Sequence, residues 1–220
     1  MTKQSRAVLL CGVAVDPPVW EQTSTVLSER GFHVVIPQRP RSGDLAAEVE
    51  FLAPLCDGAV VFGVSGGATL GLELAARGVT MTAAVLHEPA AGSLMPGLLD
   101  PVVAAFDEHG VPGFGHELYG PGWDPSMTTS NAETVARELA MFRRFEPRPL
   151  TINSSSVTLT VGAKSPRVRH ESVDALAGAL DLKVRVLPGT SHAAHLDNAF
   201  APLIEELEPM VHVHSAGSRG

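Results

Sequence analysis

Six short apolar runs recur along the chain, and each is bounded by residues typical of turns. They are Ala7–Val15, His33–Pro37, Gly58–Val64, Thr82–Glu88, Val157–Gly162 and Lys183–Leu187. None of them alternates strictly between polar and apolar residues, as a strand with one solvent-exposed face would. Continuous apolar strands of this length are typical of a parallel sheet whose two faces are both covered.

Helical patterns separate most of these runs. The predicted helices are Trp20–Arg30, Leu45–Leu55, Ala68–Arg77, Ser172–Leu180 and Ala199–Val211. Strands that alternate with helices indicate an α/β protein. We therefore predict a mainly parallel sheet of about six strands, with helices on both of its faces.

One stretch interrupts this alternation, because no good strand occurs in it. Leu94–His109 has a helical pattern, Val111–Pro125 is rich in glycine and proline, and Asn131–Phe145 is a strong helix with Asn131 as its N-cap. In α/β proteins, insertions of this kind lie above the carboxyl ends of strands, where ligands bind. We expect a core of residues 1–91 and 150–211, a small helical cap of residues 92–149, and a flexible tail of residues 212–220.

The composition narrows the class of protein. The 220 residues are 45% hydrophobic and 18% charged, which excludes a chain that is disordered as a whole. No apolar run approaches the roughly 18 residues of a membrane span. The formal net charge is −8 and no stripe of lysine or arginine stands out, so we expect neither nucleic acid nor a membrane surface as partner. The expected partner is a small-molecule substrate, and a homodimer is compatible with the sequence.

The two cysteines indicate a reducing compartment. Cys11 and Cys56 lie in or beside apolar runs and form no CxxC motif or Cys/His cluster, so no metal site and no cofactor are predicted. We interpret both as buried thiols of a cytoplasmic protein. The start of the chain imitates a secretory signal but lacks a small-x-small cleavage site, so a buried first strand is the better interpretation. The scarcity of lysine indicates a bacterial source.

The segment Gly63-Val64-Ser65-Gly66-Gly67 has the pattern G-x-S-x-G between a predicted strand and a predicted helix. A strand, a serine turn and a helix in this order form a nucleophile elbow. The turn is so tight that the residues two before and two after the serine must be small. It places Ser65 at the start of a helix, where the backbone N–H of Gly66 and the helix dipole can stabilise an oxyanion.

A serine hydroxyl becomes a good nucleophile only when a base removes its proton. His192 fits that role, because it lies in the loop that follows the last predicted strand. His195 competes with it, but we expect His195 at the start of the closing helix, facing away from the strand ends. The general base is therefore predicted to be His192.

With these motifs the chain resembles the α/β-hydrolases. The resemblance rests on the elbow, on the sequence Pro188-Gly189-x-x-His192 near the end, and on the first strand, which runs into a glycine loop with a later tryptophan. The family's usual sheet has eight strands, and the initial antiparallel pair is missing here. Cys11-Gly12 replaces the His-Gly pair common in the family. The resemblance places the second oxyanion N–H on Val13.

The catalytic acid is where this sequence departs from the family. The resemblance implies an Asp in the loop after Val157–Gly162, but that loop has no carboxylate and Glu171 comes too late. Some relatives, the haloalkane dehalogenases among them, place the acid one strand after the nucleophile, where this chain has Glu88. Glu88 is therefore predicted to orient His192. The alternatives are that Glu88 holds a loop or lines the pocket, and that Asp197, which we expect to cap the final helix, is the acid.

The remaining polar residues near the strand ends are expected to have structural roles. Asp16 is predicted to cap the helix at Trp20, and His87 to pack in the core. Gln38, Arg39 and Arg41 are interpreted as solvated loop residues.

Most of the chain's aromatic residues fall in the predicted cap. Among them Phe114, Tyr119, Trp123 and Phe142 are predicted to form a hydrophobic lid over the substrate pocket, although half could simply hold the cap on the core.

The predicted function is a serine hydrolase that cleaves an ester or thioester of a small to medium, largely apolar substrate through an acyl-enzyme on Ser65. A serine at the elbow argues against dehalogenase and epoxide hydrolase chemistry, since those relatives use Asp there. Two alternatives stay open. One is a non-hydrolytic acyltransferase, lyase or cyclase on the same scaffold. The other is a small-molecule binding protein with a degenerate triad, which the acid loop without a carboxylate favours.

Overall fold

Each of the six apolar runs contains one strand of a single parallel sheet. The computed structural model describes residues 5–207, and in this range the strand order is β2-β1-β3-β4-β5-β6. The strands are β1 (Arg6–Leu10), β2 (His33–Val35), β3 (Val60–Val64), β4 (Ala83–His87), β5 (Val157–Gly162) and β6 (Lys183–Leu187). All five pairings are parallel. The prediction of an α/β fold with a parallel sheet of about six strands is confirmed.

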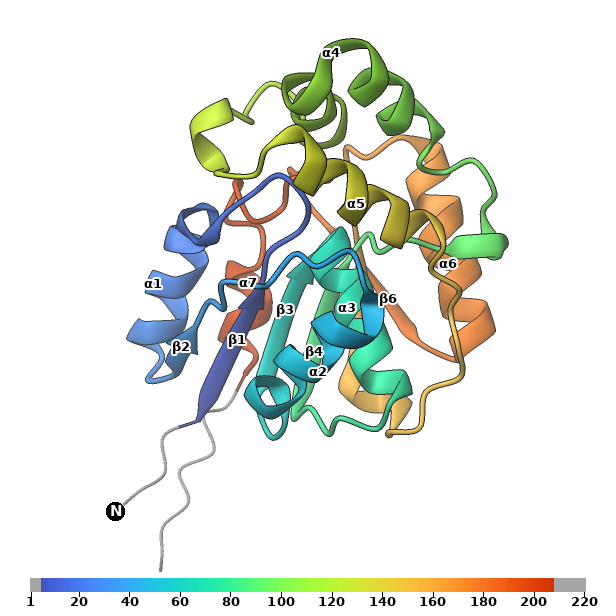
Figure 1. Cartoon of the computed structure of the whole chain (residues 1–220). Helices are drawn as coiled ribbons and strands as arrows, with labels where there is room; N and C mark the ends of the chain where they lie inside the picture. Colours follow the sequence, from blue (N-terminus) through green and yellow to red (C-terminus); the bar gives the residue numbers. More distant parts are fainter. Residues whose placement is uncertain (1–4, 208–220) are drawn as a thin grey trace, which may run out of the picture.

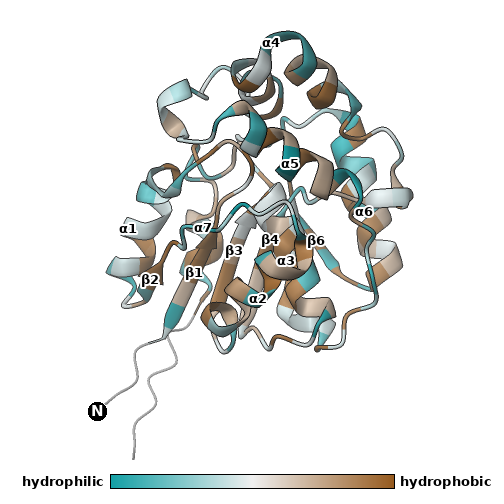
Figure 2. Cartoon of the chain, viewed as in Figure 1, coloured by the Kyte–Doolittle hydropathy of each residue, from teal (hydrophilic) through white to brown (hydrophobic). Residues whose placement is uncertain are grey.

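Burial follows position in the sheet. Every residue of the central strand β3 is buried, whereas β6 at the edge exposes most of its side chains, with Val186 55% exposed. Central parallel strands are covered on both faces, which explains why their sequences are continuously apolar. The colours of Figure 2 show the same contrast, with hydrophobic residues concentrated in the central strands.

Helices cover both faces of the sheet, as Figure 1 shows, with α2 and α3 in front of the strands and α7 behind them. The helices outside the insertion are α1 (Glu21–Glu29), α2 (Leu45–Cys56), α3 (Gly66–Ala76), α6 (Arg167–Leu180) and α7 (Ala201–Glu205). Short 3-10 helices occupy Pro17–Trp20, Gly92–Leu94, Pro125–Met127 and Ser154–Ser156. The predicted tail, 212–220, and the end of the predicted helix Ala199–Val211 lie outside the described residues.

Between β4 and β5 the insertion (residues 92–149) forms α4 (Asp100–Tyr119) and α5 (Ala132–Arg143), which lie over the carboxyl ends of the strands (Figure 1). The predicted N-cap of α5 is confirmed, because the Asn131 side chain accepts a hydrogen bond from the Thr134 N–H at 2.9 Å.

The prediction for α4 was wrong in its extent. The helix starts six residues later than Leu94 and is broken at Gly110 (φ 63°), directly after its predicted end at His109. It then continues to Tyr119, over the first part of the expected glycine- and proline-rich stretch. Proline is tolerated in a first turn, where Pro101 stands. Phe114 and Leu118 are buried, and this burial outweighs the weak helix propensity of the segment that follows Gly110.

Cys11 and Cys56 are both buried and free, as predicted. Burial raises the pKa of Cys11 to about 11 and that of Cys56 to about 12. Both thiols therefore stay protonated and weakly nucleophilic at neutral pH. Among residues 5–207 no helix combines the length and apolarity needed to cross a membrane.

Candidate active site

Ser65 stands between β3 and α3 in the conformation expected of a nucleophile elbow. Its backbone has φ 56° and ψ −119°, a strained combination for a residue with a side chain. A Cβ on Gly63 would lie 2.7 Å from backbone atoms of Gly67 and Ala68, and a Cβ on Gly67 would lie 2.1 Å from the Leu10 oxygen. The two glycines therefore make this turn sterically feasible, as the sequence pattern predicts.

Glu88 lies next to Ser65 because the strands that precede them are neighbours. In the register of β3 and β4, Val64 pairs with His87, and the Ser65 N–H donates to the His87 carbonyl at 2.9 Å. Glu88 itself has φ 46°, a left-handed conformation that is uncommon for a residue other than glycine.

The structure brings Glu88 and His192 together. His192 Nδ1 donates to Glu88 Oε2 at 2.7 Å, while Oε1 accepts from the Gly162 N–H at 3.0 Å and from the Ser165 hydroxyl. Burial alone would raise the pKa of Glu88, but the hydrogen bond and charge of His192, with smaller contributions from His87 and Ser165, hold it well below its usual range. Glu88 is therefore ionised and keeps the proton of neutral His192 on Nδ1.

With the proton on Nδ1, the other ring nitrogen of His192 is free to accept one. Nε2 is buried and has no hydrogen-bond partner among the described residues, and no hydrogen bond joins it to Ser65. Burial first, and then the charge of Arg169, lower the pKa of His192 despite the opposing effect of Glu88. The imidazole is thus a neutral base at neutral pH. Catalytic hydrogen bonds are often long before substrate binds.

Residues 13–16 form a loop beside the elbow that the insertion holds in place. The Tyr119 hydroxyl donates to the Val13 carbonyl at 2.7 Å, and Trp123 Nε1 donates to the Ala14 carbonyl at 2.9 Å. Tyr119 and Trp123 do not line the cavity beside Ser65. Instead of covering the pocket as predicted, they hold this loop in position. The Gly66 N–H opens α3, where the first amides have no acceptor within the helix.

A small cavity adjoins Ser65, with a volume of about 20 Å³. The backbone loop contributes Val13, the elbow Ser65 and Gly66, the insertion Phe114 and Phe142, and α6 Arg169. Phe114 and Phe142 thus lie where the predicted lid places them.

A larger cavity of about 230 Å³ lies next to the first, under the insertion. The two share Ala90, Leu99 and Phe142 as walls. The smaller space holds about one water molecule, so a substrate also needs room from its neighbour or from movement of these side chains.

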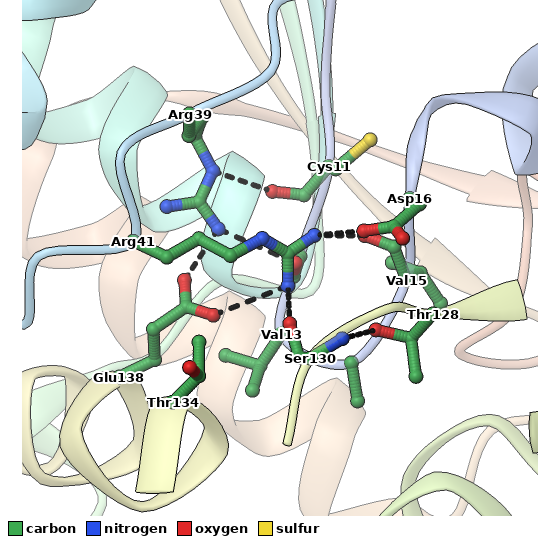
Figure 3. A network of polar contacts seen from close by, with 12 residues as sticks. Cys11, Val13, Val15, Asp16, Arg39, Arg41, Thr128, Ser130, Thr134 and Glu138 are labelled. Carbon is green, nitrogen blue, oxygen red and sulfur yellow. Dashed lines mark hydrogen bonds and ion pairs between the residues drawn. The ribbon is translucent and has the colours of Figure 1, made fainter.

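A buried network of ion pairs joins the core to α5 (Figure 3). Arg39 lies 2.8 Å from Glu48 and 2.6 Å from Glu138, and Arg41 lies 2.6 Å from Asp16 and 3.4 Å from Glu138. The two arginines also donate to backbone carbonyls. Arg39 donates to those of residues 11 and 12, which connect β1 to the loop of residues 13–16, and Arg41 donates to that of residue 15 in the loop itself.

This network overturns three predictions. Arg39 and Arg41 are not solvated loop residues, since they are 4% and 7% exposed. Asp16 caps no helix with its side chain, because its carboxylate binds Arg41 and the N–H and hydroxyl of Thr129. Sequence spacing gave no signal for these contacts, because Glu138 lies about 100 residues from its arginines. Gln38 is exposed, as predicted.

The other candidates also have partners that the sequence did not show. Asp197 accepts from the Thr190 hydroxyl at 2.5 Å and does not cap α7, whose N-cap is Phe200. His195 is not at a helix start; it is buried, its ring packs on Trp20, and neither ring nitrogen has a hydrogen-bond partner among residues 5–207. His87 is fully buried, as predicted, and bonds Thr160 and the Ser191 carbonyl at 3.0 Å each. That last bond anchors the loop that delivers His192.

Comparisons with known proteins agree with this architecture. A model of the alpha/beta hydrolase family matches residues 7–206. The structure of an enol-lactonase from Burkholderia xenovorans LB400 has TM-score 0.70 at 18% identity, over 93% of this chain and 91% of that one. MenH from S. aureus has TM-score 0.70 at 13% identity, over 92% of each chain. RedJ, a thioesterase of the prodiginine pathway in Streptomyces coelicolor, has TM-score 0.65 at 20% identity, over 93% and 89%. A search of curated proteins gives no significant match.

Proposed function

Because the chain belongs to the alpha/beta hydrolase family, we propose that it is a serine hydrolase that cleaves a carboxylic ester or thioester through an acyl-enzyme on Ser65. The observation that supports this most directly is the 2.7 Å hydrogen bond from His192 to Glu88, at the strand end next to the elbow. It fixes one tautomer of the base and leaves Nε2 free to accept a proton.

In this mechanism the Ser65 hydroxyl attacks the acyl carbon while His192 Nε2 removes its proton. The backbone N–H groups of Val13 and Gly66 bind the oxyanion that forms on the former carbonyl oxygen. The imidazolium of His192, stabilised by ionised Glu88, then protonates the leaving alcohol or thiol. Water, deprotonated by the same Nε2, attacks the acyl-enzyme, and collapse of the second oxyanion releases the acid and regenerates Ser65.

Two further facts support hydrolysis of an acyl bond. Two of the structural relatives are named as an enol-lactonase and a thioesterase. The cavity next to Ser65 is lined mainly by apolar side chains such as Phe114 and Phe142, which suits the largely apolar acyl group of a small to medium substrate.

The test is steady-state and burst kinetics with p-nitrophenyl esters of increasing acyl length. We expect Ser65→Ala and His192→Ala to lower kcat/KM by about 10³-fold or more, and Glu88→Gln to lower it by a smaller factor through loss of the favoured tautomer. Asp197→Asn is the matched carboxylate control and should change activity little. Full activity in Ser65→Ala, or an Asp197→Asn defect larger than that of Glu88→Gln, would refute the assignment. Analysis of the acyl product with and without an added alcohol separates hydrolysis from acyl transfer.

A further inference from the structure

Arg169 is a buried cation in the wall of the cavity beside Ser65. It stands in the first turn of α6, and its side chain is 10% exposed. Within residues 5–207 the guanidinium makes no hydrogen bond, and its one ion pair is with Glu88, at 3.9 Å between Nε and Oε2. A guanidinium carries five N–H donors, and buried charges are normally paired and hydrogen-bonded.

The carboxylate of Glu88 does not satisfy the hydrogen-bond donors of Arg169. Glu88 already receives hydrogen bonds from His192, from the Gly162 N–H and from the Ser165 hydroxyl. Its charge is therefore satisfied without Arg169, and a 3.9 Å separation leaves the guanidinium donors unused.

Apart from the Ser65 hydroxyl, no polar side chain of the cavity wall is left to pair with the guanidinium. Among the lining residues, Glu88 and Arg169 are the two charged ones, and Thr69 is engaged with the Ser65 carbonyl and the Ala90 N–H. The rest of the wall is mostly apolar. A ligand in this cavity thus meets both the proposed nucleophile and a guanidinium that makes no hydrogen bond within residues 5–207.

From this arrangement we propose that the substrate carries a carboxylate in addition to the bond that is cleaved, and that Arg169 binds it. This inference rests on the proposed function, since it assigns the substrate class of the same site. A carboxylate is planar and matches the two parallel N–H donors of a guanidinium. It is also small and singly charged, which suits a narrow cavity that already contains ionised Glu88 better than a phosphate does.

The experiment compares esters that differ only in charge. Monoethyl succinate and ethyl succinamate place a carboxylate or an isosteric neutral amide on the acyl side, and 4-acetoxybenzoate and 4-acetoxybenzamide do so on the leaving group. We expect the wild type to prefer the carboxylate in one of the two pairs by about 10- to 100-fold in kcat/KM. All rates are measured at pH 8, so that His192 is neutral in every variant.

Three variants test whether Arg169 causes the preference for the carboxylate ester. Arg169→Met retains the length of the side chain without the charge and should reduce the preference to near unity, mainly through KM. Arg169→Lys should retain part of it. Arg167→Met is the matched control, because Arg167 lies on the same helix with its side chain 91% exposed, and it should leave the preference intact.

The outcomes separate this inference from the proposed hydrolysis. If the wild type cleaves the neutral esters but shows no preference in either pair, the carboxylate site is refuted and the hydrolase stands. If Arg169→Met loses activity equally on both members of a pair, Arg169 serves Glu88 and the inference fails.

If the wild type cleaves none of the esters, thermal unfolding with succinate or 4-hydroxybenzoate decides the question. A rise in Tm that Arg169→Met abolishes and Arg167→Met retains supports the carboxylate site without hydrolysis. No rise in Tm refutes it.

Discussion

Two buried arginine sites near the carboxyl edge of the sheet are built in opposite ways. Arg39 makes ion pairs with Glu48 and Glu138 at 2.8 and 2.6 Å and also donates to two backbone carbonyls. Arg169 makes no hydrogen bond in the described chain. The pKa of each group follows its surroundings. Burial disfavours both charges, but Glu138 and Glu48 raise the pKa of Arg39, whereas burial lowers that of Arg169.

The difference separates a structural charge from a charge that awaits a ligand. Arg39 uses four of its five N–H donors, on two carboxylates and two carbonyls, and joins segments that are distant in sequence, here the core and α5 (Figure 3). Where the donors are free and face the cavity of the proposed nucleophile, their partner is expected to arrive with the substrate. Burial alone therefore does not tell the two roles apart, and the count of hydrogen bonds does.

The largest expected effect tests the structural side of this comparison. Arg39→Met leaves buried Glu48 without its ion-pair partner and should lower the free energy of unfolding by about 3–5 kcal/mol, whereas Glu138→Gln leaves Arg39 paired with Glu48 and Arg41 with Asp16 and should cost less. Arg169→Met should change it by less than about 1 kcal/mol, because Glu88 retains three hydrogen bonds. Urea denaturation at pH 7 measures all three. Glu133→Gln, on the exposed face of α5, is the control. If Arg39→Met and Arg169→Met lowered the free energy of unfolding equally, the two arginines would not differ in structural role.

A second effect extends the comparison to a buried group with no polar partner at all. Burial lowers the pKa of His195 from 6.5 to about 3, so the folded protein keeps it neutral while the unfolded chain protonates it below pH 6.5. A folded pKa below the unfolded one means that stability is lost as pH falls. The loss from this one residue between pH 7 and pH 5 is about 2 kcal/mol.

His195→Leu removes that contribution. Its free energy of unfolding, from urea titrations at pH 5 to 7, should fall by about 2 kcal/mol less than that of the wild type over this range. His87, whose pKa burial lowers to about 4, remains in both proteins and keeps the background slope the same. Parallel curves for the two proteins would show that His195 is not titrated on unfolding in this way.

The smallest effect concerns the pH dependence of activity and sharpens the role of Arg169. Burial and the Arg169 charge lower the pKa of His192, so the neutral base persists below pH 6.5 and the acid limb of kcat/KM should lie below that value. In Arg169→Met the limb should move to higher pH, and in Arg167→Met it should not. The profile is measured with ethyl succinamate, whose charge does not change. An unmoved limb would show that the guanidinium does not influence the base.

Sequence reasoning succeeded where local pattern and steric necessity determine the result. The six strands follow from apolar runs, and the elbow at Ser65 follows from glycines whose Cβ atoms would collide with the backbone. Glu88 was predicted as the acid by elimination, since the expected acid loop has no carboxylate. Its hydrogen bond to His192 could be anticipated because both residues follow strands that end at one edge of the sheet.

The same reasoning failed where contacts depend on tertiary packing. Arg39 and Arg41 follow a strand in a segment that reads as a solvated loop, and nothing near them in sequence announces Glu138. Arg169 lies in a segment that the sequence predicts as a loop, and nothing near it in sequence indicates the cavity that it lines. The helix α4 crosses a stretch whose glycines and prolines predict a loop, because long-range burial there outweighs local propensity.

The loop of residues 13–16 is held both by the core and by the insertion. From the core, Arg41 donates to the Val15 carbonyl at 2.6 Å and pairs with Asp16 at 2.6 Å. The insertion supplies the Tyr119 bond to the Val13 carbonyl, the Trp123 bond to the Ala14 carbonyl, the Met127 carbonyl that receives the Asp16 N–H at 2.7 Å, and the Thr129 contacts to the Asp16 carboxylate. A cavity of about 20 Å³ admits a substrate only if the substrate extends into the neighbouring cavity or part of the wall moves. If the insertion moves, the loop loses these contacts and retains those to Arg41. Access to the cavity and the position of the loop beside Ser65 are then coupled through the insertion.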